Sequence, residues 1–192
     1  MKGVADDTNH VRSARAQFER EVTAHLDRLY TFALRLCRAQ HDAEDLVSET
    51  IVRAFDRWRQ YTLGTNARAW LFTILYHVFV NHRRIQRREV LISESDYETP
   101  RFNVVGDSDP ESTFYDSIVD EEVTRAIDDL PQHYREAVLL SDVLDFRYAE
   151  IAEILGVPEG TAKSRLFRAR RMLQRKLIRY AVEMGYVKPR AA

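Results

Sequence analysis

The sequence holds a single cysteine, Cys37, among its 192 residues. One cysteine can form neither an internal disulfide nor a thiolate metal cluster, so we expect a cytoplasmic protein in a reducing compartment. No run approaches the roughly 18 apolar residues that a membrane-spanning helix needs. The start, MKGVADDTNH, has no apolar segment of signal-peptide type. Membrane insertion is therefore not expected. Cys37 falls on the apolar side of a helical pattern, which favours core packing, while a redox role stays open.

The motifs of common enzyme classes are also missing. The sequence has no glycine-rich phosphate loop and no Ser-His-Asp order. The carboxylates between Asp42 and Glu49 could suggest acid–base or metal chemistry, but no His or Asp elsewhere completes a ligand set. His41, close to Asp45, is interpreted as a surface residue. We therefore predict no catalytic activity, no metal site and no cofactor.

The overall charge is almost balanced, with 29 Lys and Arg against 30 Asp and Glu. This balance argues neither for nor against a nucleic-acid partner, so the distribution of charge along the chain carries the information. The hydrophobic fraction of 45 % is that of a globular protein rather than a disordered one.

Apolar residues recur three and four positions apart along most of the chain, which is the spacing of amphipathic helices. Three such stripes begin at Phe18, Val47 and Trp70. Asp42 stands where the second helix would take its N-cap, and the break at Gly64-Thr65-Asn66 offers the cap of the third. The third stripe runs into a basic end, HRRIQRR.

The helical period is absent between Ser93 and Ser117 and resumes at Ile118. The fold class predicted from this pattern is all-α, with two small helical domains at residues 15–90 and 118–182. A flexible acidic linker at residues 91–117 joins them.

The stretch from Glu94 to Asp129, which includes most of the linker, has twelve acidic residues against two basic ones. One interpretation is a solvated tether whose like charges repel. The other is a segment that mimics the charge of nucleic acid inside a basic channel of a partner. The sequence leaves both open.

The segment YAEIAEILGVPEGTAKSRLFRARRML has the spacing of a helix-turn-helix. Ala152 is small where two helices must cross closely. Gly156 follows four residues later, where a left-handed residue ends the first helix without steric cost. Pro158 prevents that helix from continuing.

The second helix of this motif concentrates positive charge. From Glu159 to Tyr180 there are eight Lys or Arg and one acid, as phosphate binding requires. Phe167 projects among the basic residues rather than on the side of Leu166, and contact with a thymine methyl is one reason to keep it there. A basic, solvated helix at the end of a bundle is the plainer interpretation.

Two separate stretches resemble one protein family. DAEDLVSETIVRAFDRW is similar to the region through which sigma factors of bacterial RNA polymerase bind the core enzyme. The segment from LPQHYREAVLL to RARRML resembles their fourth conserved region. Their order, with an acidic linker between them, resembles the extracytoplasmic-function (ECF) class of the sigma-70 family. The resemblance covers residues 15–90 and 118–180.

This resemblance implies roles for residues of the first domain. One group would face the coiled coil of the largest polymerase subunit, beta-prime: Asp42, Glu44, Asp45, Glu49 and Arg53. A second group would engage the −10 element as it melts: Phe72, Tyr76, His77, Phe79, Asn81, Arg83, Arg84, Arg87 and Arg88. Aromatic rings could stack on bases and arginines could hold phosphates. Phe72 and Phe79 fit the core equally well.

In the second domain, the resemblance assigns the −35 element to six residues: Arg147, Lys163, Ser164, Phe167, Arg168 and Arg171. Arg147 and Arg171 would hold phosphates, and the other four match recognition-helix positions. Part of the recognition would use DNA shape.

The partners implied are core RNA polymerase, through its beta-prime and beta subunits, promoter DNA, and an anti-sigma factor that holds the protein inactive until a stress signal. GTN-x-x-AWL at residues 64–71 is similar to the redox- and heat-responsive branch, whose anti-sigma factors often bind zinc.

Two alternatives belong to other classes. A conventional helix-turn-helix regulator would bind its operator without polymerase, but it leaves residues 15–90 unexplained. An enzyme acting on nucleic acid would need a carboxylate metal cluster or a nucleophile, and neither pattern is present.

Overall fold

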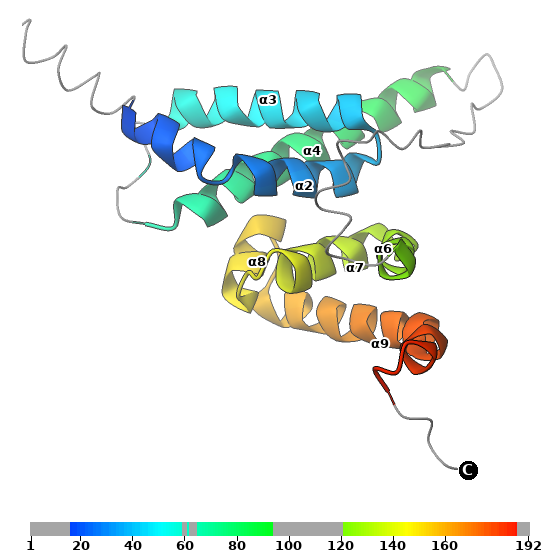
Figure 1. The fold of residues 1–192 in the computed structure, drawn as a ribbon. Helices are drawn as coiled ribbons and strands as arrows, with labels where there is room; N and C mark the ends of the chain where they lie inside the picture. The colour runs from blue at the N-terminus through cyan, green and yellow to red at the C-terminus, as the bar shows by residue number, and fades with distance from the viewer. Residues whose placement is uncertain (1–15, 59–60, 62–64, 94–120, 188–192) are drawn as a thin grey trace, which may run out of the picture. The chain divides into compact units, whose positions relative to one another are not determined.

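A computed structural model describes residues 16–58, 61, 65–93 and 121–187. The chain divides into two compact units, residues 1–105 and 106–192 (Figure 1). Every regular element among the described residues is a helix, which confirms the predicted all-α class. The predicted linker lies outside the described residues from residue 94 onward.

Unit 1 is built from a helical stretch over residues 16–23 and three longer helices, α2 (Leu26–Cys37), α3 (Gln40–Arg57) and α4 (Ala67–Ser93). Each contributes one apolar face to a common core, and the side chains at its centre are almost fully buried: Leu29, Phe32, Leu46, Leu71, Phe72, Leu75 and Val78. The predicted stripes thus form the core of this unit. α4 continues past the predicted domain boundary at residue 90.

The start of α3 differs from the prediction. The helix begins at Gln40 with Ala39 as its N-cap, so Asp42 lies in the first turn instead of capping it. The cause is Arg38, whose left-handed backbone (φ 62°) ends α2 and turns the chain directly into α3. The carboxylate of Asp42 still lies at the positive end of the helix dipole.

An aromatic cluster joins the end of α3 to the start of α4. The rings of Trp58 and Tyr61 stack with centroids 4.9 Å apart, and Tyr61 lies 5.0 Å from Trp70 at the start of α4. Asn66 caps α4 as predicted, because its side-chain oxygen accepts a hydrogen bond from the N–H of Ala69 at 3.1 Å.

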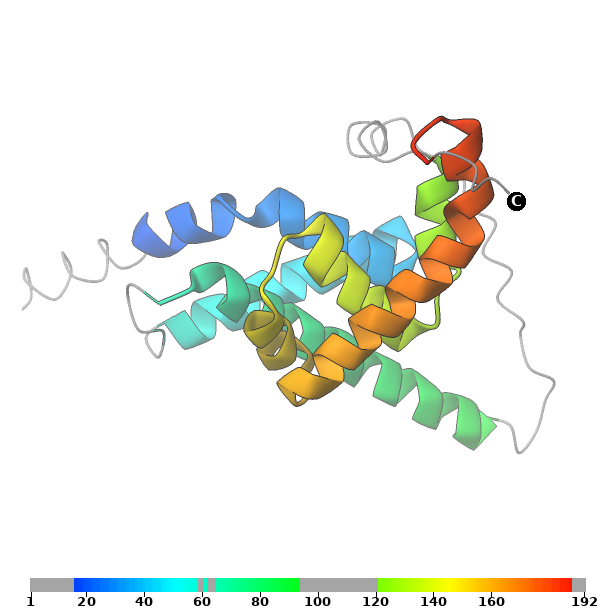
Figure 2. The ribbon, with the colours of Figure 1, turned by 90° about the horizontal axis from the view of Figure 1, so that it is seen from below.

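Unit 2 contains α6 (Glu121–Asp128), α7 (Gln132–Val138), a π-helical turn η3 (Leu139–Val143), α8 (Tyr148–Leu155) and α9 (Glu159–Glu183). The long helix α9 is the base on which the others pack. α8 lies beside its amino-terminal end and α6 beside its carboxy-terminal end (Figures 1 and 2). The core draws on each of these elements and includes Ile127, Val138, Leu140, Ile151, Ile154 and Leu166.

Candidate functional site

The turn between α8 and α9 has the geometry of a helix-turn-helix. Gly156 ends α8 in the left-handed conformation (φ 62°), and Pro158 is the N-cap of α9. The N–H of Val157 donates to the carbonyl of Ala152 at 3.0 Å, which ties the turn to α8. A Cβ at position 156 would meet no atom within 4 Å, so the backbone angle, and not space, favours glycine there. The predicted turn is confirmed.

α9 presents two distinct faces over its first three turns. Ala162, Leu166 and Ala169 are buried against the rest of unit 2. The opposite face is exposed and carries the predicted −35 residues Lys163, Ser164, Phe167, Arg168 and Arg171. All five residues are therefore accessible to a ligand.

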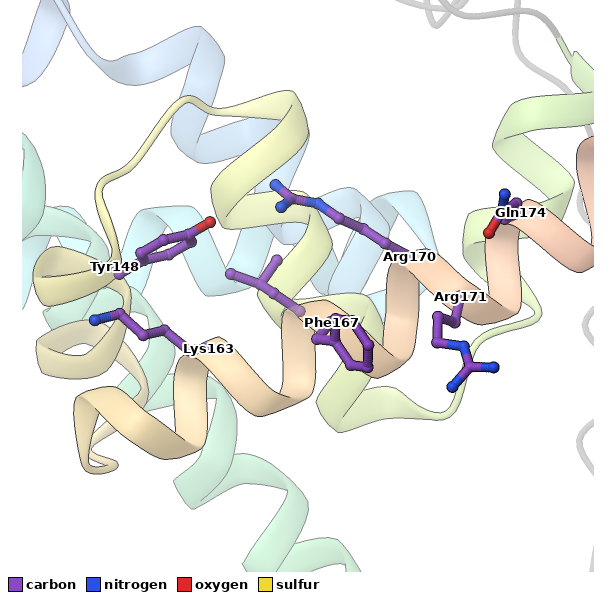
Figure 3. A pocket seen from close by; sticks show the side chains of 7 residues that line it. Tyr148, Lys163, Phe167, Arg170, Arg171 and Gln174 are labelled. Atoms are coloured by element: carbon purple, nitrogen blue, oxygen red, sulfur yellow. The ribbon is translucent and has the colours of Figure 1, made fainter. Parts of the chain in front are cut away.

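Phe167 is the most unusual member of this face, because 63 % of its surface is exposed. The guanidinium of Arg171 lies 5.9 Å from the centre of its ring, within the range of a cation–π contact. Figure 3 shows Phe167 and Arg171 side by side on α9, away from the ring of Tyr148 on α8. An exposed ring among cations can contact both the apolar and the anionic parts of a nucleic acid.

Lys163 makes two contacts within unit 2. Its Nζ lies 2.6 Å from a carboxylate oxygen of Glu159 and 5.7 Å from the centre of the Tyr148 ring. The hydrogen bond that Lys163 donates to Glu159, and then the charge of that carboxylate, raise the pKa of Lys163. The side chains of Tyr148 and Lys163 line part of a groove between α8 and α9 (Figure 3).

Arg147 precedes α8 and closes a capping box. Its backbone N–H donates to the Glu150 carboxylate at 2.7 Å, and its guanidinium lies 3.3 Å from the other oxygen. The side chain is otherwise exposed, so it remains accessible to a phosphate.

In unit 1, the predicted polymerase-binding residues divide into two groups. Asp42, Glu44 and Asp45 are exposed near the start of α3. Glu49 and Arg53 are half-buried and paired with each other at 2.6 Å. The predicted acidic face is therefore present, although Glu49 is not a free acceptor.

Sequence reasoning missed two apolar side chains on α3. Val52 and Phe55 are 60 % and 51 % exposed. The periodicity placed Phe55 in the core stripe, but half of its surface is exposed, and its ring makes an edge contact with Phe18 at 5.4 Å. Val52 lies off the apolar stripe, and an apolar residue in such a position could have been predicted to be exposed. Both add apolar area to the exposed side of α3.

Two of the predicted −10 residues on α4 lie in the core of unit 1. Phe72 and Phe79 are core residues, 0 % and 4 % exposed, because α4 turns both rings toward the rest of unit 1. Neither ring is exposed for stacking on a base in this conformation, which favours the core alternative. Their assignment as DNA contacts stays a prediction.

The other predicted −10 residues are accessible to different degrees. His77 and Arg84 are exposed, and Tyr76, Asn81 and Arg83 are partly exposed. Arg84 donates to the side chain of Asn81 at 3.1 Å. The side chains of two further residues of this set lie outside the described part of the chain: Arg87 and Arg88.

Cys37 lies at the end of α2, partly buried. Burial, and next the nearby carboxylate of Asp42, raise the pKa of its thiol to about 11, while Arg83 opposes the shift. A thiol held protonated is a poor nucleophile and metal ligand, which agrees with a packing role.

Two further kinds of site are absent among the described residues. Within that part of the chain, His, Cys, Asp and Glu side chains form no group of three or more that could hold a metal ion. None of the described helices is both long enough and apolar enough to cross a membrane.

Comparison with known families agrees with this geometry. The family model for Sigma-70 region 2 matches residues 22–89, and the model for Sigma-70, region 4 matches residues 120–173. The chain is 35 % identical over 178 residues to the ECF RNA polymerase sigma factor SigE of Mycolicibacterium smegmatis, covering 92 % of this chain and 68 % of the relative. It is 37 % identical over 153 residues to EcfG of Rhodopseudomonas palustris, covering 80 % and 81 %.

Solved structures give the same result. The sigma factor RpoE from Bartonella quintana, in complex with the anti-sigma factor NepR, matches with 32 % identity and a TM-score of 0.66, over 84 % of this chain and 96 % of that one. CnrH, in complex with the cytosolic domain of CnrY, shares the fold with 20 % identity and a TM-score of 0.60, over 87 % and 93 %. The chain belongs to the sigma-70 family of RNA polymerase sigma factors and, within that family, to the ECF class.

Membership of this family makes the chain a transcription initiation factor and confirms the resemblance found in the sequence. A conventional helix-turn-helix regulator finds no support, because the region 2 match accounts for the part of the chain that such a regulator leaves unexplained. The roles of individual residues stay predictions.

Proposed function

We propose that this ECF sigma factor binds the beta-prime and beta subunits of core RNA polymerase and directs it to promoters whose −35 element is read by α9. The observation that carries the proposal is the exposed phenylalanine, Phe167, within a cationic face that follows a helix-turn-helix. A monomeric regulator and a sigma factor could share that face. Only a sigma factor also needs a second, acidic surface for polymerase.

That second surface is the exposed start of α3, with Asp42, Glu44 and Asp45. Three carboxylates within about one turn of helix favour a basic partner surface, and their exposure means that binding need not uncover a buried charge. We propose that beta-prime binds here and that Arg53, paired with Glu49, forms the border of the interface.

On unit 2, we propose that Lys163, Ser164, Phe167 and Arg168 read the −35 element, while Arg147 and Arg171 hold phosphates. The support is their common exposure on or beside the first turns of α9. The groove beside Phe167 and the cation over its ring suit a thymine methyl and a neighbouring phosphate.

On unit 1, we propose that the accessible part of α4 engages the −10 element. Tyr76, His77, Asn81, Arg83 and Arg84 supply an aromatic face, hydrogen-bonding groups and cations along consecutive turns. Phe72 and Phe79 act here only by fixing the helix from within the core.

We further propose an anti-sigma factor as an inhibitory partner. The support is the likeness to RpoE, whose solved structure contains the anti-sigma factor NepR. Val52 and Phe55 offer it apolar area next to the acidic surface of α3. The resemblance of residues 64–71 to the redox-responsive branch favours a zinc-binding inhibitor. The protein itself would act in the cytoplasm, without catalytic activity.

The test is gel filtration of the chain with core RNA polymerase, followed by selection of promoter fragments from a DNA library by the complex and by the chain alone. We expect co-elution with polymerase, and fragments with shared −35 and −10 elements retained only by the complex. A chain that elutes apart from polymerase, or that selects the same fragments without it, would overturn the proposal.

A further inference from the structure

Glu49 and His82 connect α3 to α4 across 33 residues of sequence. Nε2 of His82 lies 2.6 Å from one carboxylate oxygen of Glu49, and NH2 of Arg53 lies 2.6 Å from the other. Both oxygens of Glu49 are therefore engaged within unit 1. The three side chains are between 33 % and 39 % exposed, so the contact lies at the edge of the interface between the helices.

This contact follows the last buried side chains of α4 within the described part of the helix. Val78 and Phe79 are buried, but none of the side chains from Val80 to Gln86 is. A helix segment without buried side chains is held by few contacts and opens easily. The hydrogen bond from His82 to α3 falls one turn beyond Phe79, in the segment that carries the proposed −10 residues Asn81, Arg83 and Arg84.

The same contact reaches the proposed polymerase surface. Glu49 lies one turn after Asp45 on α3, and Arg53 follows one turn later. A force or a displacement at α3 is thus transmitted to α4 by a short, directional bond between two side chains. Glu49 and His82 can therefore affect the position of α4 without touching DNA themselves.

We propose that His82 is a positioning residue for promoter opening. Through Glu49 it fixes the orientation of residues 80–86 of α4, and so couples the polymerase-facing helix to the helix that engages the melting −10 element. This inference rests on the proposed function. It gives Glu49 a second role, as the acceptor that holds His82, in addition to its place at the border of the polymerase surface.

The experiment uses the full chain assembled with core polymerase on a promoter that the wild-type holoenzyme opens. Two quantities are measured: the Kd for core polymerase, and the fraction of open promoter from the permanganate reactivity of −10 thymines at saturating protein. His82→Leu removes the donor, and His82→Gln keeps an N–H that can reach Glu49. Gln86→Leu, one turn further on α4, is the matched control.

We expect His82→Leu to leave the Kd for polymerase within about twofold and to lower the equilibrium constant for promoter opening, obtained from the open fraction, roughly three- to tenfold, the range that one hydrogen bond of ordinary strength gives. His82→Gln should recover most of the opening, and Gln86→Leu should behave as wild type. Equal opening by His82→Leu and wild type would overturn the inference, as would a parallel loss of polymerase affinity.

A double-mutant cycle separates positioning from direct DNA contact. Glu49→Ala should reduce opening at saturating protein, and adding His82→Leu should reduce it no further, because both changes remove one interaction. Additive losses would mean that His82 acts independently of Glu49, which contradicts the inference alone. If wild-type protein opens no promoter with polymerase, the proposed function fails and the inference falls with it.

Discussion

Arg170 of α9 binds Asp142 of η3 through two separate nitrogens. Nε lies 3.1 Å from one carboxylate oxygen, and NH2 lies 2.5 Å from the other and 3.1 Å from the hydroxyl of Ser141. The hydrogen bond with Asp142, followed by one with Tyr148, raises the pKa of Arg170 further. Arg170 thus connects α9 to η3 and holds α9 in a defined orientation.

We predict that Asp142→Ala lowers the free energy of unfolding of unit 2 by about 1 kcal/mol, a modest value because the pair is partly exposed. Promoter selectivity should fall with it, because α9 loses an orienting contact. Affinity for non-specific DNA should stay the same or rise, because the substitution removes a carboxylate that would repel the DNA phosphates. Urea unfolding and filter binding to promoter and random duplexes measure the three quantities.

Glu153→Ala, on the exposed side of α8, removes the same charge without breaking the pair and serves as the control. Equal selectivity in Asp142→Ala and Glu153→Ala would show that the Arg170 contact does not orient α9 for recognition.

Arg168 and Arg171 are both exposed on α9, but we assign them different tasks. Arg168→Ala should cost about 1–3 kcal/mol in promoter selectivity if it reads a base edge. Arg171→Ala should weaken all duplexes almost equally and reduce the salt slope of binding by about one. Holoenzyme binding to matched and mutated −35 elements at several salt concentrations tests both, and identical behaviour of the two variants would refute the assignment.

Asp45 is exposed at the start of α3, and its carboxylate lies 3.6 Å from the imidazole of His41. Asp45→Arg should abolish polymerase binding, because a cation would then face a basic surface. DNA binding by unit 2 should not change. Asp27→Arg makes the same charge change on α2 and should keep polymerase affinity. Anisotropy titration with core polymerase gives the answer, and retained binding by Asp45→Arg would place the interface elsewhere.

Cys37 should react slowly with alkylating agents in the folded protein. A pKa of about 11 against an ordinary 9.0 leaves roughly a hundredfold less thiolate at pH 8. The rate of iodoacetamide labelling should rise with pH up to that value, and Asp42→Asn should shift the profile to lower pH by removing a carboxylate that disfavours the thiolate. Protein unfolded in urea is the reference. Folded protein that reacts as fast as the reference would indicate a redox-competent thiol.

The sequence predicted those features that depend on local chemistry. Gly156 and Pro158 specify the turn through backbone angles, and Asn66 caps α4 through its own side chain. The exposure of Phe167 follows from its position off the apolar stripe of α9. Each of these depends on neighbours within a few residues, which a linear pattern reveals.

The features that the sequence did not predict depend on which helix packs against which. Phe72 and Phe79 fitted both core and DNA contact, and only the packing of α4 places them inside. Phe55 matched the apolar stripe of α3 but lies at its edge. The bond between Glu49 and His82 joins residues 33 positions apart, for which no local signal exists.

The measurement that tests the account most directly is run-off transcription by purified core RNA polymerase, with and without this protein, on a library of promoter fragments. We predict specific transcripts that appear only with the protein and whose templates share one −35 and one −10 element. No transcripts, together with retention of particular fragments by the protein alone, would contradict the account and favour a regulator that acts outside the polymerase.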